Sequence, residues 1–147
     1  MTDLAEAVRL HVFREAAATT RIPQPPEIAK SLGRPETEIR GALGELAASR
    51  VIVLAPASGN IWIAAPFCAV PSSFQVHALG RVYHGICIWD ALGILAILGS
   101  DGTVHAACGD CGDPLRLEVE AGRLVHSEGV IHFGVPALRW WDNIGFT

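Results

Sequence analysis

A cysteine and an aspartate lie three residues apart inside an almost unbroken apolar segment, residues 86–98. They are Cys87 and Asp90. If the segment is helical, this separation brings both side chains to one face. A thiolate is a strong nucleophile and a ligand for soft metals, and a carboxyl group in apolar surroundings keeps its proton to higher pH. The pair therefore predicts thiolate chemistry assisted by a proton donor.

Both residues also have ordinary structural interpretations. Cys87 could be a small buried hydrophobic residue, as free cysteines often are. Asp90 could cap a helix over residues 91–98, because its carboxylate would accept hydrogen bonds from the first backbone amides. The pattern Cys-x-x-Asp is short, so it leaves these interpretations open.

A second thiol pair lies in the segment Cys-Gly-Asp-Cys-Gly-Asp-Pro, which begins at Cys108 and contains Cys111. A turn of this kind directs backbone amides toward thiolates and is typical of half a zinc site. The remaining zinc ligands would have to come from distant positions: Cys68, Cys87, His105 or His126. A redox dithiol usually lies in a βαβ unit, which this sequence does not indicate. The pair is therefore a zinc site, a spare dithiol near the active site, or a turn with unreactive thiols.

The first half of the chain, residues 1–65, has the element order of a winged helix and is predicted to form one domain. Apolar periodicity and turn residues predict three helices and then two strands, at 3–18, 27–32, 35–49, 51–54 and 61–64. A DNA-recognition helix needs cations that face the groove. The third helix and its end offer Arg40 and Arg50, but glutamates balance them. We therefore expect a scaffold and no DNA partner.

The second half, residues 66–147, is predicted to form a mixed core of one apolar helix and an antiparallel sheet. Its expected strands are 74–76, 80–83, 103–107, 115–120, 123–126 and 130–133. Trp140 and Trp141 are expected to form a packing face, or else the wall of an apolar pocket. The whole chain is thus predicted to be an α+β protein.

Composition narrows the class of protein. The chain has 147 residues and a net charge of −4, which argues against general binding to nucleic acid or to anionic membranes. The apolar segment 86–98 is shorter than the roughly 20 residues that span a bilayer. The N-terminal residues contain no signal-peptide core, so we expect a cytoplasmic protein whose four cysteines serve metal or redox chemistry rather than disulfides.

Several stretches in the same order resemble the organomercurial (alkylmercury) lyase family. Pro66-Phe-Cys-Ala-Val-Pro71 is similar to the segment that joins the family's N-terminal part to its core, and Cys87-Ile-Trp-Asp90 to its catalytic Cys-x-x-Asp. Residues 108–114 resemble a cysteine-containing turn of the family. Residues 130–136 and 140–147 resemble the approach to its second catalytic cysteine. The resemblance is strongest over residues 66–147.

The resemblance implies cleavage of a carbon–mercury bond by protonolysis, with Cys87 as thiolate and Asp90 as proton carrier. It implies no organic cofactor, an organomercurial substrate, and a thiol acceptor for Hg²⁺ such as a mercuric reductase. The family's second cysteine would fall at or just beyond position 147, where this sequence ends. Cys68, Cys108 and Cys111 are the candidate substitutes, and we favour the Cys108/Cys111 pair.

Two other functions stay open at this point. One is a protein that binds Hg²⁺, Cu⁺ or Zn²⁺ through thiolates without turnover. The other is a winged-helix regulator that senses metal through Cys87, Cys108 and Cys111.

Overall fold

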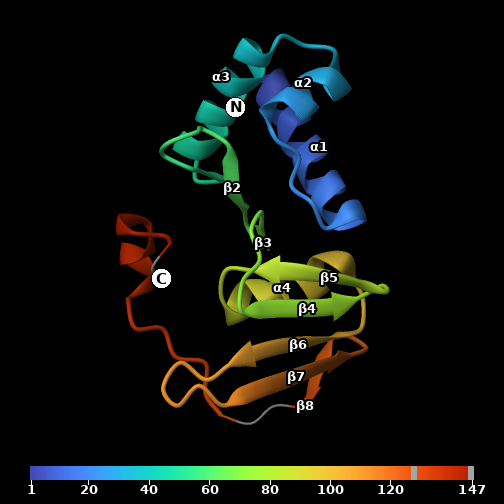
Figure 1. Cartoon of the computed structure of the whole chain (residues 1–147), viewed down its shortest axis with the longest axis vertical. Coiled ribbons are helices and arrows are strands. Elements are labelled where there is room, and N and C mark those ends of the chain that lie inside the picture. The colour runs from blue at the N-terminus through green and yellow to red at the C-terminus, as the bar shows by residue number, and fades with distance from the viewer. Residues whose placement is uncertain (127–128, 146–147) are drawn as a thin grey trace.

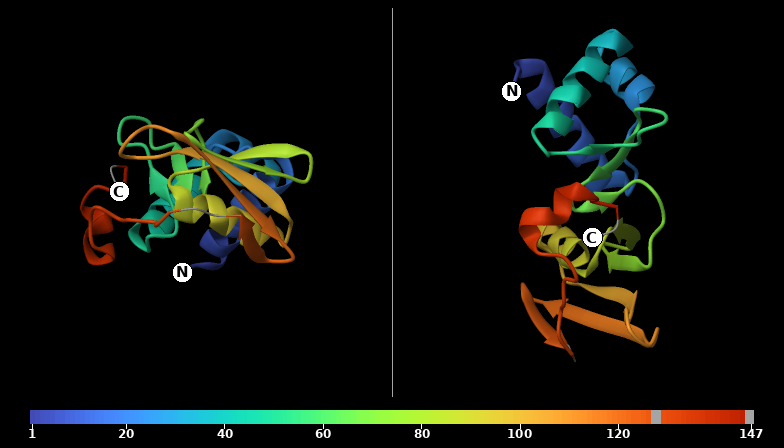
Figure 2. Two further views of the ribbon diagram at one scale, coloured as in Figure 1. Left: turned by 90° about the horizontal axis from the view of Figure 1, so that it is seen from below. Right: turned by 90° about the vertical axis from the view of Figure 1, so that its left-hand side faces the viewer.

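The computed structural model describes residues 1–126 and 129–145. It has helices at one end, a five-stranded antiparallel sheet at the other, and a small three-stranded sheet and a fourth helix between them (Figures 1 and 2). The chain is therefore an α+β protein, as the sequence predicts. None of the helices within the described residues is long and apolar enough to cross a membrane.

Three helices form the N-terminal end, close to the positions expected from apolar periodicity. They are α1 (Asp3–Thr19), α2 (Pro25–Leu32) and α3 (Glu36–Ala48). Their inward positions, including Val8, Ile28 and Leu43, are fully buried. Helix α1 begins at a side-chain cap, because the Thr2 hydroxyl accepts a hydrogen bond from the Ala5 amide at 3.2 Å.

A small sheet of three strands follows, in the order β1 (Val53–Leu54), β2 (Ile61–Ala64) and β3 (Phe67–Cys68). The hairpin of β1 and β2 was expected from the sequence, whereas β3 was not. Strand β3 pairs antiparallel with β2, with Ile63 opposite Cys68. This sheet therefore continues across the division predicted between residues 65 and 66.

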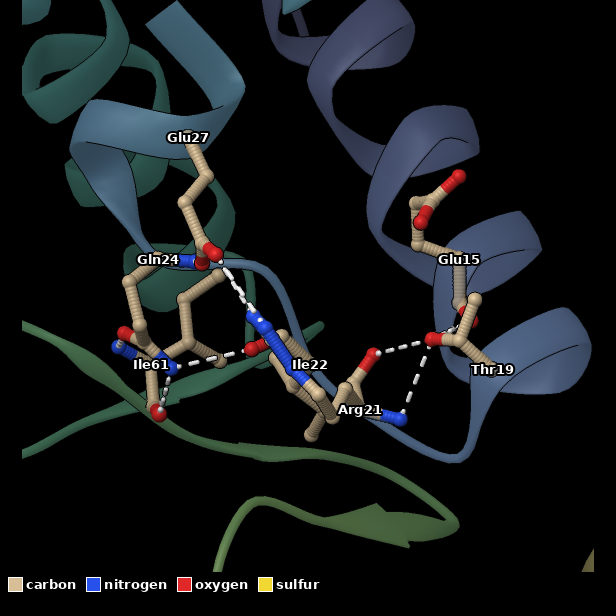
Figure 3. A network of polar contacts seen from close by, with 7 residues as sticks. All are labelled: Glu15, Thr19, Arg21, Ile22, Gln24, Glu27 and Ile61. Atoms are coloured by element: carbon tan, nitrogen blue, oxygen red, sulfur yellow. Dashed lines mark hydrogen bonds and ion pairs between the residues drawn. The ribbon is translucent and has the colours of Figure 1, made fainter.

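Gln24 fixes the small sheet against the helices (Figure 3). Its side-chain amide donates to the Ile61 carbonyl at 3.2 Å and accepts from the Ile61 amide at 2.9 Å. Gln24 is also the N-cap of α2, and the Glu27 carboxylate returns to its backbone amide at 2.8 Å. One residue thus ties the start of α2 to the start of β2.

The second sheet has the strand order β5–β4–β6–β7–β8, and all neighbouring pairs are antiparallel. Its strands are β4 (Phe74–Ala78), β5 (Arg81–Gly85), β6 (Gly102–Ala107), β7 (Pro114–Glu120) and β8 (Arg123–His126). Alternate residues such as Val76 and Val104 point into the core and are fully buried. Helix α4 (Ile88–Leu98) lies behind β4 and β5 in Figure 1 and buries Ile94 and Leu95 in the same core.

The start of α4 corrects one expectation. Cys87 is the N-cap residue and Ile88 the first helical residue, so Asp90 lies inside the first turn and does not cap a helix over 91–98. The apolar residues Ile88 and Trp89 therefore belong to the helix. Helix α4 ends at Gly99, which adopts φ +58° and a left-handed conformation typical of a C-terminal glycine.

The C-terminal segment also differs from the expectation. Residues 130–133 form no strand, and a 3₁₀ helix, η1 (Ala137–Asp142), follows them. Figures 1 and 2 show this segment returning from the far sheet to the level of the small sheet. Gly145 packs directly against the Trp62 ring, where an added Cβ would overlap the ring. The absence of a side chain at Gly145 thus allows the segment to lie close to β2.

Candidate functional site

Cys87 and Asp90 meet at the start of α4. The Cys87 thiol donates a hydrogen bond to Asp90 Oδ2, with 3.5 Å between sulfur and oxygen. The spacing of three residues makes this contact, because the N-cap residue and the third residue of the helix, both in the first turn, face each other. The proximity expected from the sequence is confirmed; the catalytic roles stay a prediction.

Burial sets the protonation of both groups. Burial raises the pKa of the Asp90 carboxyl above its ordinary value, although hydrogen bonds from the Cys87 thiol and from the amides of Cys87 and Ile86 oppose it. Burial also raises the pKa of the Cys87 thiol, and the negative charge of Asp90 adds to this effect, against the opposing amides of Asp90 and Trp89. Burial therefore shifts both groups toward their protonated forms relative to the same groups in water.

The pair lies in the wall of an apolar pocket of about 170 Å³. Three parts of the chain form the wall: the start of α4, the small sheet with the residues before it, and the C-terminal segment. Aromatic side chains of the C-terminal segment form one side: Phe133, Trp140 and Trp141. An engineered apolar cavity of about 150 Å³ binds benzene. The pocket therefore has the volume and polarity to hold a phenyl group or a short alkyl chain.

The C-terminal wall is held by its own contacts. The Trp140 indole donates to the Val135 carbonyl at 2.8 Å, and its ring lies 4.9 Å from that of Phe133 between centroids. Trp140 and Trp141 thus take the second of the two roles expected for them, as pocket walls.

Arg50 is a pocket residue that sequence reasoning missed. Its guanidinium lies 5.5 Å from the centre of the Trp141 ring. The sequence showed Arg50 only as a cation at the end of a helix. Its place beside Trp141 depends on contact between segments about ninety residues apart, which no local pattern indicates.

Cys68 lies on β3 and is 7% exposed. Burial raises the pKa of the Cys68 thiol, and the charge of Asp90 raises it further. The carboxylate therefore influences two thiols, Cys87 and Cys68. Cys68 is not among the residues that line the pocket.

Cys108 and Cys111 lie elsewhere, in the exposed turn between β6 and β7. The Cys108 amide donates to the Asp113 carbonyl at 2.8 Å, and the Gly112 amide to the Cys108 carbonyl at 3.0 Å, which closes the turn. The amides of Cys111 and Asp110 hold the pKa of Cys108 below its ordinary value. Neither thiol lines the pocket with Cys87 and Asp90.

The zinc hypothesis gains no support from the described residues, which contain no cluster of three or more His, Cys, Asp or Glu side chains able to hold a metal. His105 contacts the ring of His77 and the hydroxyl of Thr103 instead. The side chain of His126, another candidate ligand, lies outside what the structure describes, as do Phe146 and Thr147.

A thiol that is hydrogen-bonded to a carboxyl group beside an apolar pocket, on an α+β fold, is the arrangement that thiolate chemistry would need. Residues 67–147, more than half of the chain, match the family model described as MerB, alkylmercury lyase. The chain therefore belongs to the alkylmercury lyase family.

The fold supports this assignment. A solved structure described as the mercury-bound form of MerB2 superposes with a TM-score of 0.68 at 20% sequence identity. The match covers 86% of this chain and 60% of that chain. At this identity the likeness concerns the fold alone. A search of curated proteins by sequence gave no match.

Proposed function

We propose that this protein cleaves the carbon–mercury bond of organomercurials by protonolysis. The observation that carries the proposal is the contact of 3.5 Å between Cys87 Sγ and Asp90 Oδ2 in the wall of a pocket of about 170 Å³. Mercury(II) is a soft metal that prefers thiolate to oxygen or nitrogen ligands. The apolar pocket suits the organic group, and the thiol beside it suits the metal.

The reaction balances with the groups present. As the Cys87 sulfur binds the mercury of R–Hg⁺, its proton passes to the Asp90 carboxylate. The protonated Asp90 then donates this proton to the carbon as the carbon–mercury bond breaks, which releases R–H and leaves Hg²⁺ on the sulfur. The raised pKa of Asp90, caused mainly by burial, suits a group that must hold a proton between these steps.

A second thiolate would add electron density to the mercury and weaken its bond to carbon. Besides Cys87, Cys68 is the described thiol whose pKa is raised by the charge of Asp90, so we propose it in this role before Cys108 and Cys111. The product Hg²⁺ would leave by exchange onto an external thiol, such as one of a mercuric reductase. No organic cofactor takes part in this scheme.

Release of hydrocarbon tests the proposal. Phenylmercury incubated with the protein in D₂O should yield benzene that carries one deuterium, because the transferred proton comes from exchangeable groups. We expect Cys87→Ser and Asp90→Asn to lower the rate at least about a hundredfold, as expected for loss of a nucleophile or a general acid. Gas chromatography with mass detection measures the product.

Two further variants sharpen the test. Cys68→Ala should slow release if Cys68 is the second thiolate, whereas Cys108→Ser/Cys111→Ser should slow it if that pair is. Mercury retained in stoichiometric amount without any hydrocarbon would show a binding protein instead of a lyase. Equal release by wild type, Cys87→Ser and Asp90→Asn would refute the assignment of both residues.

A further inference from the structure

Arg50 is the one cation in the pocket wall, as far as the described residues extend. Asp90 is the one acid there, and the remaining lining is apolar apart from the Cys87 thiol. Apolar walls select ligands mainly by size, whereas polar groups in a wall select them by chemistry. A single cation in an apolar wall is therefore suited to recognise a specific group of the ligand.

The backbone holds Arg50 in an uncommon conformation. Arg50 follows α3 with φ +60°, in the left-handed region that favours glycine. Its amide donates to the Ala47 carbonyl at 2.9 Å, and the Val51 amide to the Leu46 carbonyl at 2.9 Å. These bonds end α3 and direct residues 50–53 along the pocket, so the side chain starts from a fixed position.

The guanidinium is free to bind an anion. Its central carbon lies 5.5 Å from the centre of the Trp141 ring, a cation–π contact that uses none of the hydrogen-bond donors of the guanidinium. Within the described part of the chain, Arg50 makes no ion pair with an acid. Several other arginines do pair with carboxylates: Arg9, Arg21, Arg34, Arg40, Arg116 and Arg139.

We infer that Arg50 selects organomercurials whose organic group carries a carboxylate. This inference rests on the proposed function for its substrate class. Cys87 and Arg50 line the same pocket. The inference places the mercury on Cys87, the aryl ring in the pocket and the carboxylate of the ring on Arg50. The planar guanidinium matches a carboxylate with two parallel hydrogen bonds. Arg50 therefore acts on specificity and takes no part in proton transfer.

The test compares two reagents of similar size that differ in one charge. The rate at which Cys87 captures 4-(hydroxymercuri)benzoate is divided by the rate at which it captures phenylmercury. The ultraviolet absorbance of the new mercury–sulfur bond reports both rates. The protein carries Cys108→Ser and Cys111→Ser, which removes the two more exposed thiols, and Cys87→Ser in the same background gives the signal from Cys68.

We expect Arg50→Gln to lower this ratio about three- to tenfold, the range of an exposed but bidentate ion pair. Division by the phenylmercury rate corrects for any effect of the substitution on the pocket itself. Arg50→Lys should restore part of the ratio, and Arg50→Glu should lower it further. Added salt should reduce the wild-type ratio, because it screens a charge pair that is open to solvent.

Arg123→Gln is the matched control, since Arg123 is exposed on β8 and does not line the pocket. Its ratio should equal that of wild type. Two results would overturn the inference. One is an unchanged ratio in Arg50→Gln and Arg50→Glu, and the other is capture by Cys87→Ser that is as fast as capture by the protein that retains Cys87. Capture precedes cleavage, so a changed ratio without hydrocarbon release would refute the lyase proposal alone. Release with an unchanged ratio would refute the role of Arg50 alone.

Discussion

The Cys87 thiol donates a hydrogen bond to Asp90 at 3.5 Å, which stabilises the carboxylate, whereas the charge of Asp90 raises the pKa of the thiol. A free thiolate beside an ionised carboxylate would carry two negative charges in a half-buried site, which burial penalises. In the proposed reaction, the incoming mercury replaces the proton of this thiol.

At the scale of this residue pair, we predict that Asp90→Asn shifts the alkylation of Cys87 to lower pH. Burial is the main cause of the raised pKa of Cys87 and persists in the variant, but the contribution of the Asp90 charge is lost. The folded-state pKa of the thiol therefore falls, and more thiolate is present at each pH below it. Iodoacetamide labelling across a pH series, followed by mass spectrometry of the Cys87 peptide, measures the profile.

Asp3→Asn is a suitable control for this experiment, because Asp3 is exposed in the first turn of α1. It should leave the profile of Cys87 unchanged. A shift to higher pH in Asp90→Asn would contradict the proposed effect of the carboxylate on the sulfur.

At the scale of elements, the site depends on how closely α4 approaches the end of β5. Gly85 is buried at this junction, and an added Cβ would lie 2.8 Å from the Ala91 amide nitrogen and 3.2 Å from its Cα. Both atoms belong to the backbone of the helix, so they can move only with its first turn. That turn carries Cys87 as N-cap and Asp90. Glycine at position 85 thus allows the first turn of α4, with Cys87 and Asp90, to lie close to the sheet.

We predict that Gly85→Ala lowers the free energy of unfolding by about 1–3 kcal/mol, the usual cost of overpacking a core. It should also slow mercury capture by Cys87, because the first turn of α4 is displaced. Chemical denaturation and the capture assay measure the two effects.

The control is Gly41→Ala in α3, where an added Cβ would meet nothing within 4 Å. This change should raise the stability by about 0.5–1 kcal/mol, since alanine is the better helix former. Equal stability of the two variants would contradict a close approach at Gly85.

At the scale of the whole molecule, one continuous core joins the N-terminal helices to the five-stranded sheet. Its buried residues come from both halves, for example Val12 of α1 and Val104 of β6. Tyr83 of β5 is fully buried, and its hydroxyl donates to the Ala17 carbonyl at 2.9 Å. This carbonyl belongs to the last turn of α1, where carbonyls have no partner within the helix. The pocket, whose wall also comes from both halves, therefore depends on their packing.

We predict that Tyr83→Phe lowers the free energy of unfolding by about 0.5–1.5 kcal/mol, because the half-buried carbonyl of Ala17 loses its donor. Tyr83→Ala should cost more, about 3–5 kcal/mol, since it also leaves a cavity. Unfolding should stay a single transition when followed by circular dichroism and by tryptophan fluorescence. Loss of only one half of the signal at lower denaturant would show that the halves unfold separately.

Much of this protein follows from local sequence. Apolar periodicity places the helices within a few residues of their observed bounds, and the three-residue spacing of Cys87 and Asp90 is sufficient to bring them together at a helix start. Strand β3 escaped prediction because two residues carry no periodic pattern. A strand was wrongly expected at 130–133 because its apolar residues do not pair with a sheet. One of them, Phe133, lines the pocket instead.

The pocket was decided by tertiary structure alone. Arg50, Trp141 and Cys87 are far apart in the chain and meet because a continuous core fixes the relative positions of the segments that carry them. The sequence by itself determined that Cys87 and Asp90 lie within hydrogen-bonding distance, since that depends on neighbours within one helical turn. Only the packed fold decided what surrounds this pair, because burial and charge depend on residues that no short-range pattern connects.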